Sequence, residues 1–258
     1  RYKIKLEDGK KAWTNGQYIT LDGEVTVDKL QSISNNLYFN CKLYILIMSI
    51  EILNYWRFLM RDIDYGIFPY TSSSSTIAAY APIGAGIPAH VPDHIVGVLK
   101  AYSTCVGAGP FVAETAMPQS WLDMLRRLGG EYGAATGRPR RVGPVDIPAS
   151  CYGLKCQNAD KIALTKLDVL SAFTEIPVIT GYRYGDQVTD RFDPDCDLEK
   201  YEPVVETIPG WQQSISKCRT WEELPDNAKA YIALLEKLLD HEIQFISVGA
   251  KRDEYLLK

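Results

Sequence analysis

The chain has 258 residues, of which 46% are hydrophobic and 23% charged, enough for one large domain or two small ones with a sizeable core. This composition excludes a disordered or fibrous protein. The formal charge of -4 provides no broad basic surface for nucleic acid or an anionic membrane. The longest strongly apolar run without charge, Leu43 to Ile50, is far shorter than the roughly 18 residues that span a bilayer. We therefore expect a soluble protein that holds any anionic ligand through local clusters of cations.

Six cysteines are too few for a disulfide scaffold, and the closest pair, Cys151 and Cys156, does not form a C-x-x-C motif. The three histidines add no second pair at zinc-finger spacing. No apolar signal segment follows Arg1, and the absence of an initial methionine leaves room for an upstream region. We expect a cytoplasmic protein with reduced thiols and no structural zinc site.

The first thirty residues contain two Asp-Gly pairs, Asp8-Gly9 and Asp22-Gly23, between alternating apolar and polar residues, which predicts a small meander of hairpins. From Leu37 to Met60 the sequence is apolar and lacks glycine and proline, as in a buried helix or a helix and a strand. After Met60, glycine, proline and serine residues separate short apolar segments, as in an α/β domain whose loops bind ligands. We therefore divide the chain into residues 1–61 and residues 62–258.

Helix and strand signals are clearest in the second segment. Residues 119–127 predict a helix with Trp121, Leu122, Leu125 and Leu128 on one side. Pro225-Asp226 opens a second helix whose apolar stripe comprises Tyr231, Ile232, Leu235, Leu238 and Leu239. The apolar runs 162–165 and 243–248 predict short buried strands of a mostly parallel central sheet with flanking helices, whose carboxyl ends bear ligands.

A candidate guanine site directly follows the first of these predicted strands. Asp168 can accept hydrogen bonds from N1-H and the 2-amino group of guanine, a donor pair that adenine lacks. The aliphatic stem of Lys166 can cover the face of the ring. A solvated loop is the competing interpretation of this short motif.

A glycine-rich run, residues 129–137, ends in three arginines, Arg138, Arg140 and Arg141. Glycines let backbone N-H groups approach an anion, Thr136 adds a hydroxyl, and guanidinium groups pair bidentately with carboxylate or phosphate. Neighbouring arginines repel one another unless an anion neutralises them, which favours a ligand-binding loop over a solvent-facing basic turn.

Residues 71–76 form an unbroken run of six hydroxyl side chains, suited to a phosphate or a ribose or to a flexible linker. Their flanks indicate ordered turns, and both interpretations stay open. Asp62 and Asp64 lie just before this run and are the nearest carboxylates that could serve as a base.

The sequence contains no Walker A motif, no G-x-G-x-x-G and no H-E-x-x-H, and none of its histidines is favoured as a catalytic base.

Several of these segments, taken in order, resemble the C-terminal half of adenylosuccinate synthetase. The resemblance covers about residues 62–258 and is carried by Asp62 to Tyr70, Lys100 to Phe111, the arginine loop, Thr165 to Leu170, Ile208 to Trp211 and Ser247 to Gly249. It implies an incomplete P-loop-NTPase-like α/β fold. It also implies a cytoplasmic homodimer that joins inosine monophosphate (IMP) to L-aspartate in AMP biosynthesis, with GTP as a substrate and Mg2+ as the metal.

The resemblance also implies three groups of site residues. The aspartate-binding group would comprise Ala134, Ala135, Thr136, Gly137, Arg138 and Arg140. The GTP-binding group would comprise Arg140, Lys166, Asp168, Ser247 and Gly249. The IMP-binding group would comprise Thr71, Ser72, Val106 and Arg138.

The chain departs from the family pattern at single positions and over one long region. The single positions are Ala135, Cys105, Pro144 and Ala250, where many members carry threonine, arginine, tryptophan and proline. The family's G-D-E-G-K-G phosphate loop, with its base aspartate, and its histidine and magnesium contacts have no counterpart, so no catalytic residue and no metal ligand is assigned here. Ile50 to Met60 stands where an F-E-G-A-Q segment is expected.

We therefore expect an adenylosuccinate synthetase represented by an incomplete chain that makes no adenylosuccinate at a useful rate by itself. One alternative is a non-catalytic guanine-nucleotide-binding or subunit-like protein derived from this family. A second alternative keeps the chemistry but takes a guanine-type nucleotide in place of IMP.

Overall fold

The computed structural model describes residues 2–5, 11–14, 59–133 and 136–258. Near the N-terminus, β1 (Tyr2–Lys5) pairs antiparallel with β2 (Lys11–Thr14). This pair is the first predicted hairpin. The turn at Asp8-Gly9, the hairpin expected at Asp22-Gly23 and most of the apolar run before Met60 lie outside the described residues.

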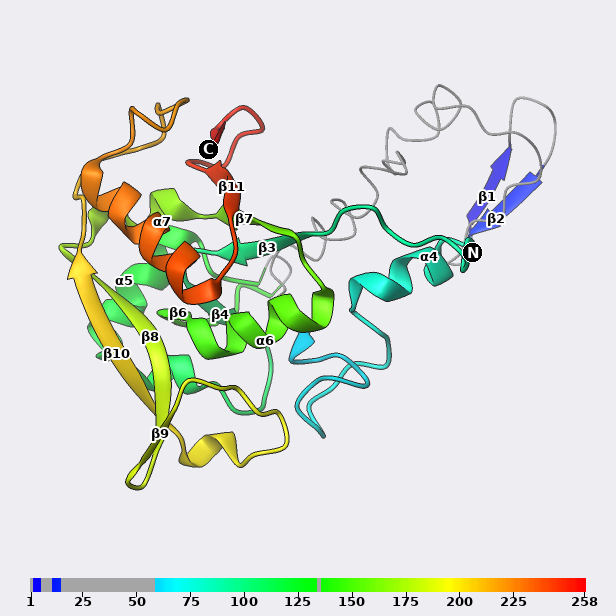
Figure 1. Cartoon of the computed structure of the whole chain (residues 1–258), viewed down its shortest axis with the longest axis horizontal. Helices are drawn as coiled ribbons and strands as arrows, with labels where there is room; N and C mark the ends of the chain where they lie inside the picture. The colour runs from blue at the N-terminus through cyan, green and yellow to red at the C-terminus, as the bar shows by residue number, and fades with distance from the viewer. Residues whose placement is uncertain (1, 6–10, 15–58, 134–135) are drawn as a thin grey trace.

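A four-stranded sheet forms the centre of the domain, in the order β12, β11, β7, β3 (Figure 1). The strands β3 (Val96–Lys100), β7 (Lys161–Thr165) and β11 (Ile243–Ser247) run parallel, and β12 (Tyr255–Leu257) is antiparallel at the edge. Since their carboxyl ends meet at one edge, residues that follow β3, β7 and β11 converge there. The predicted α/β fold with a mostly parallel central sheet is confirmed.

Helices α5 (Gln119–Gly129), α6 (Ile147–Gln157) and α7 (Asp226–Leu239) pack apolar side chains into the core. The predicted stripe of α7 is buried or half-buried throughout, and α6 and α7 lie side by side (Figure 1). On α5, Leu128 is 42% exposed, so its predicted core position is wrong. The neighbouring Gly129 faces the core instead, because only a missing side chain leaves room there for the Tyr102 hydroxyl. A short helix, α4 (Ala81–Gly84), precedes β3.

A second four-stranded sheet was not expected from the sequence. The long strands β8 (Glu175–Tyr184) and β10 (Glu202–Pro209) pair antiparallel, β9 (Gln187–Thr189) pairs antiparallel with β8, and β6 (Val145–Asp146) runs parallel to it. The strands β4 (Ser103–Cys105) and β5 (Arg141–Gly143) form a separate antiparallel pair. The remaining elements are short 3-10 helices, η1 (Ala78–Tyr80), η2 (Val112–Thr115), η3 (Leu167–Ala172) and η4 (Leu198–Lys200).

The buried residues form two clusters. The larger one fills the space between the central sheet and its helices, and the smaller one packs Met60, Phe111, Ile179 and Tyr182 beside the second sheet. In the described part of the chain, no helix combines the length and the apolar character needed to cross a membrane.

Candidate functional site

The predicted guanine ligands come together at the carboxyl edge of the central sheet. Lys166 and Asp168 directly follow β7, and Ser247 ends the adjacent parallel strand β11. Glu254, which packs against Gly249, lies close enough to Asp168 to raise its pKa. Residues about 80 positions apart in the sequence therefore meet at one site, as expected because the carboxyl ends of parallel strands share one edge of the sheet.

Lys166 joins the guanine group to the end of α5. Its backbone adopts a left-handed conformation with φ +63°, which is uncommon for a residue with a side chain. Its Nζ donates to the carbonyl oxygen of Gly129 at 3.0 Å, at the negative end of the helix dipole. The lysine is thus held by a defined contact and is not part of a solvated loop.

Asp168 is half-buried at the start of η3. Burial raises the pKa of its carboxyl, with a further contribution from Glu254, although backbone N-H groups and Lys166 act in the opposite direction. A carboxylate that has lost part of its hydration gains more from two ligand donors than a fully solvated one does. This environment suits the proposed contact with guanine.

Ser247 and Gly249 form a tight turn. Ser247 Oγ donates to the carbonyl oxygen of Gly249 at 2.9 Å. A Cβ atom at Gly249 would lie 2.2 Å from Glu254 Oε2, an oxygen that accepts the backbone N-H of Lys251 at 2.9 Å. A side chain at this position would therefore displace the Glu254 carboxylate, a neighbour of the site that sequence reasoning missed.

The predicted aspartate loop is a hairpin-like projection between α5 and β5. Tyr132 bridges Pro139, and the Gly133 N-H donates to the Arg138 carbonyl at 2.8 Å. Thr136, Gly137 and Arg138 are exposed, and Gly137 has φ +63°. The predicted ligands Ala134 and Ala135 lie outside the described residues.

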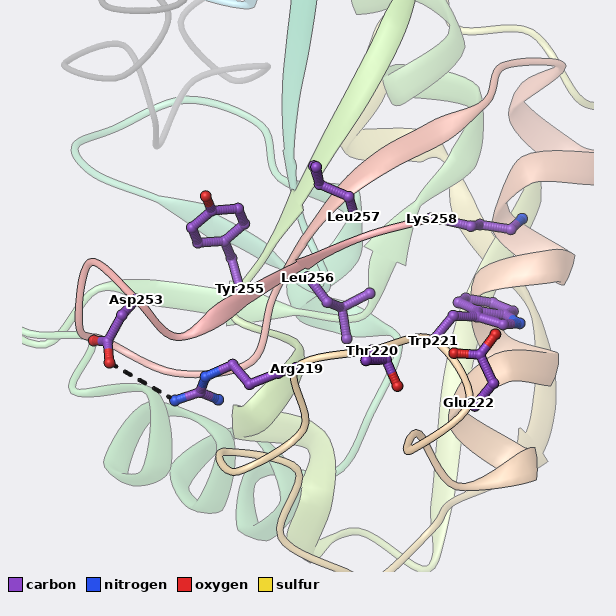
Figure 2. Close-up of a pocket in the computed structure, with 9 residues that line it drawn as sticks. All are labelled: Arg219, Thr220, Trp221, Glu222, Asp253, Tyr255, Leu256, Leu257 and Lys258. Atoms are coloured by element: carbon purple, nitrogen blue, oxygen red, sulfur yellow. Dashed lines mark ion pairs between the residues drawn. The ribbon is translucent and has the colours of Figure 1, made fainter.

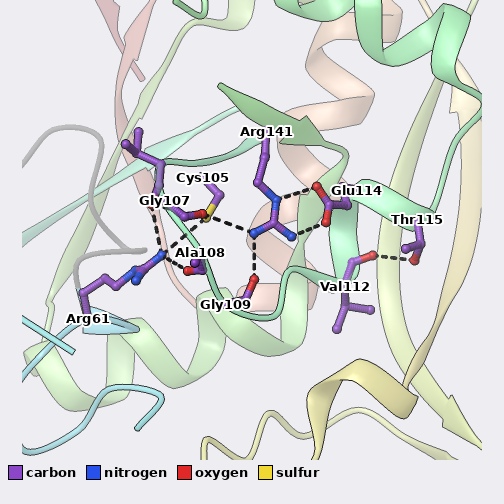
Figure 3. A network of polar contacts seen from close by, with 10 residues as sticks. Arg61, Cys105, Gly107, Ala108, Gly109, Val112, Glu114, Thr115 and Arg141 are labelled. Atoms are coloured by element: carbon purple, nitrogen blue, oxygen red, sulfur yellow. Dashed lines mark hydrogen bonds and ion pairs between the residues drawn. The ribbon is translucent and has the colours of Figure 1, made fainter. Parts of the chain in front are cut away.

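The three neighbouring arginines have different environments. Arg140 Nη1 lies 3.0 Å from Glu131 Oε2. Arg141 pairs bidentately with Glu114, with Nε 2.6 Å from Oε2, and also donates to the Gly109 carbonyl at 2.7 Å (Figure 3). Arg140 and Arg141 thus each have an internal carboxylate partner, so part of the repulsion among the three arginines is neutralised within the fold. Among the described residues, Arg138 has no ion pair and remains available to a ligand.

The hydroxyl run at residues 71–76 is an ordered turn and not a linker. Thr71 and Ser72 are half-buried, and the Ser72 N-H donates to the Arg61 carbonyl at 2.6 Å. Thr76 is buried, and its Oγ1 donates to Asp62 Oδ2 at 2.9 Å. The linker interpretation is therefore wrong, and the phosphate or ribose interpretation stays a prediction.

Arg61 brings the proposed IMP-binding segments together. Its guanidinium donates to the carbonyl oxygens of Tyr70 at 2.9 Å and of Val106 at 3.0 Å. Val106, 71% exposed, therefore lies on the same side as the start of the hydroxyl run. The pairing of Cys105 with Arg141 in β4 and β5 also places Val106 near the base of the arginine loop. No sequence signal distinguished Arg61 from a surface arginine.

Asp62 is not available as a base, which agrees with the assignment of no catalytic residue to this chain. Its carboxylate is fully buried, and it accepts hydrogen bonds from the backbone of Asp64 at 2.9 Å, Tyr65 at 3.1 Å and Thr76, and from the Thr76 hydroxyl. Burial alone would raise the pKa of Asp62, but these hydrogen bonds hold it below its usual value. The side chain organises the turn and has no free oxygen for proton transfer.

A cavity of about 750 Å³ lies apart from these groups, between residues 219–222 and the C-terminal strand (Figure 2). Arg219 lies 4.0 Å from Asp253 at one end, and Lys258 Nζ lies 4.9 Å from the centre of the Trp221 ring at the other. None of the predicted site residues lines it. Among the described residues, no group of three or more His, Cys, Asp and Glu side chains could hold a metal ion.

Comparison with known proteins agrees with this geometry. Residues 57–256 match the sequence profile of the family described as adenylosuccinate synthetase. The chain belongs to the adenylosuccinate synthetase family. The predicted family is thus confirmed, and the guanine, aspartate and IMP groups all fall within the matched range.

Curated relatives and a solved structure extend this finding. Adenylosuccinate synthetase of Thermodesulfovibrio yellowstonii is 42% identical over 200 residues, covering 77% of this chain and 47% of the relative, and that of Geotalea uraniireducens is 44% identical over 199 residues. Fully ligated adenylosuccinate synthetase from Plasmodium falciparum superposes with a TM-score of 0.70 at 40% identity, over 78% of this chain and 48% of that chain. The chain spans about half the length of the relatives that it matches.

Proposed function

We propose that the chain is the guanine- and aspartate-recognising part of an adenylosuccinate synthetase, which joins IMP to L-aspartate with GTP in AMP biosynthesis. The observation that carries this proposal is the convergence of Lys166 and Asp168 with Ser247 and Gly249 at one sheet edge. Within this family, such a site serves a ligase that works as a cytoplasmic homodimer.

Three recognition tasks fall to residues of this chain. Asp168 accepts the two donors of guanine, which selects GTP over ATP. The exposed Arg138 at the tip of the aspartate loop binds a carboxylate of the amino acid. The ordered hydroxyl run and Val106 contact the nucleotide that accepts the amino group. Together these contacts orient the aspartate amine toward the purine ring, which supplies the proximity part of catalysis.

The proton and phosphoryl transfer steps are not assigned to the described residues. Asp62 has all its lone-pair directions occupied by donors, as shown above. Magnesium would stabilise charge on the transferring phosphoryl group. Since the described residues offer no acidic or histidine cluster that could hold it, we derive no step through the metal.

Calorimetry with the 258-residue chain tests the proposal directly. GTP should bind at least 10-fold more tightly than ATP, because adenine presents an acceptor where Asp168 needs a donor. A parallel assay with IMP, aspartate, GTP and Mg2+ separates the enzyme from a non-catalytic guanine-nucleotide-binding protein, and replacing IMP with GMP tests a guanine-type acceptor. Equal affinity for GTP and ATP would refute the proposed recognition.

Replacing Arg138 by lysine is expected to weaken aspartate binding by about 10-fold. Lysine keeps the positive charge but loses the two parallel N-H donors that match a carboxylate. The dissociation constant for aspartate, measured by calorimetry at saturating GTP and IMP, reports the change. Arg127→Lys on the exposed side of α5 is the matched control and should leave that constant within a factor of two of the wild-type value. An unchanged constant in Arg138→Lys would contradict the assignment.

A further inference from the structure

A buried ionic network lies at the base of the aspartate loop. Glu131 is 1% exposed, and its Oε1 accepts hydrogen bonds from Lys100 Nζ at 2.9 Å and from the Tyr102 hydroxyl at 2.6 Å. Its other oxygen, Oε2, accepts from Arg140 Nη1 at 3.0 Å. Glu131 therefore links the end of β3 to the arginine that closes the loop.

The charges of this network do not balance. One carboxylate, Glu131, faces two cations, Lys100 and Arg140, which leaves an excess of one positive charge. Burial would raise the pKa of Glu131, but the nearby Lys100 and Arg140 hold it below its usual value, so the carboxylate is charged at neutral pH. Burial lowers the pKa of Lys100, although Glu131 acts against this effect. An additional anion at this position would complete the neutralisation.

Arg140 is held at one end only. Its Nη1 is fixed by Glu131, whereas its Nε is buried and has no hydrogen-bond partner among the described residues. A buried donor without an acceptor is costly, which points to a ligand acceptor on this side of the guanidinium.

We propose that Glu131 is a positioning residue, which orients the Arg140 guanidinium so that its unpaired Nε-H is directed to the carboxylate of the bound amino acid. Glu131 itself touches no ligand. The proposal rests on the proposed function only for the identity of that ligand, because the orientation of Arg140 is a property of the unliganded chain.

The backbone at the base of the loop is held independently of the Glu131 side chain. The Glu131 N-H donates to the Arg126 carbonyl at 2.9 Å, and the Arg140 N-H donates to the Glu131 carbonyl at 2.9 Å. Replacing only the carboxylate should therefore release the guanidinium while the loop base keeps its path.

The variant Glu131→Gln tests the proposal through the side-chain Nε-H resonances of the arginines, measured by relaxation in isotope-labelled protein. In the wild-type chain we expect a rigid Arg140 signal, and in the variant an order parameter below about 0.6, as for flexible groups. Arg126 and Arg141 are internal controls, because their Nε atoms donate to the Arg140 carbonyl at 2.9 Å and to Glu114 at 2.6 Å. Both arginines should keep their wild-type order parameters. A general loss of structure would lower those values as well.

Two further measurements complete the test. Glu131→Asp keeps the negative charge on a shorter side chain, so Arg140 should be less mobile in this variant than in Glu131→Gln. If the glutamine variant does not fold, the aspartate variant is compared with the wild type instead. At saturating GTP and IMP, Glu131→Gln should raise the dissociation constant for aspartate at least 10-fold.

An Arg140 signal that is as rigid in both variants as in the wild type would overturn the proposal. If the wild-type chain binds no aspartate, the proposed function fails for this chain, while the arginine signals still decide the role of Glu131.

Discussion

Replacing Asp62 by alanine is expected to lower the free energy of unfolding by about 3 kcal/mol, enough to remove a large part of the stability of an ordinary domain. The substitution removes the acceptor of the Thr76 hydroxyl and of the backbone N-H groups of Thr76, Asp64 and Tyr65. Thr76 is buried, so its donors cannot turn to water. Urea unfolding followed by circular dichroism measures the change.

The neighbouring Asp64→Ala is the matched control. Asp64 belongs to the same Asp62-Ile63-Asp64 motif but is exposed, so its removal should change the free energy of unfolding by no more than about 0.5 kcal/mol. Equal effects of the two substitutions would show that the buried hydrogen bonds of Asp62 contribute little.

The pH dependence of stability provides a second test of Asp62. Because the pKa of Asp62 in the folded chain is below its usual value, its stabilising contribution is present above the unfolded pKa and is lost as the pH falls through the folded pKa. The difference in unfolding free energy between the wild type and Asp62→Asn should therefore shrink below about pH 4. A difference that stays constant down to pH 2 would contradict this reasoning.

Replacing Asp168 by asparagine is expected to weaken GTP binding by 10-fold to 100-fold, which corresponds to about 1.4 to 2.8 kcal/mol. The amide places a donor or a single acceptor opposite the two guanine donors, so at least one hydrogen bond is lost and one buried donor stays unpaired. The affinity for ATP should hardly change. Calorimetric titration with both nucleotides measures the loss of selectivity.

Asp186→Asn is the control for this experiment. Asp186 lies in the exposed turn between β8 and β9, which belong to the second sheet and not to the central sheet of the guanine group, and its replacement should leave both affinities unchanged. If Asp168→Asn keeps the wild-type preference for GTP, guanine selection must reside in other contacts.

Where the sequence was sufficient, a local pattern carried the information. The apolar spacing of α7 and the short runs of β7 and β11 can be identified from neighbouring residues, since a helix buries every third or fourth side chain and a short apolar run is typical of a strand. The position of Lys166 and Asp168 at a strand end follows from the same pattern. The motifs that carried the family resemblance are likewise continuous segments.

Where the sequence failed, the deciding contact joined distant positions. The pairing of β8 with β10 depends on residues that meet only after the chain has folded back. Arg141 and Glu114 are 27 positions apart, and Arg61 reaches the Ala108 carbonyl across 47 positions. The sequence does not show that Arg140 and Arg141 each pair with an internal carboxylate, so charge repulsion alone could not say which arginine stays without an ion pair.

The sequence by itself thus determined the family, the α/β class and the position of Lys166 and Asp168, the proposed guanine ligands, at a strand end, because each depends on residues close together in the chain or on the rule that parallel strands share an edge. The tertiary structure alone decided which charged groups are free for a ligand. Arg138 is exposed, whereas Arg141 and Asp62 have their polar atoms occupied by partners within the fold. The physical reason is that the availability of a charge depends on its burial and its partners, and both are set by contacts between distant segments.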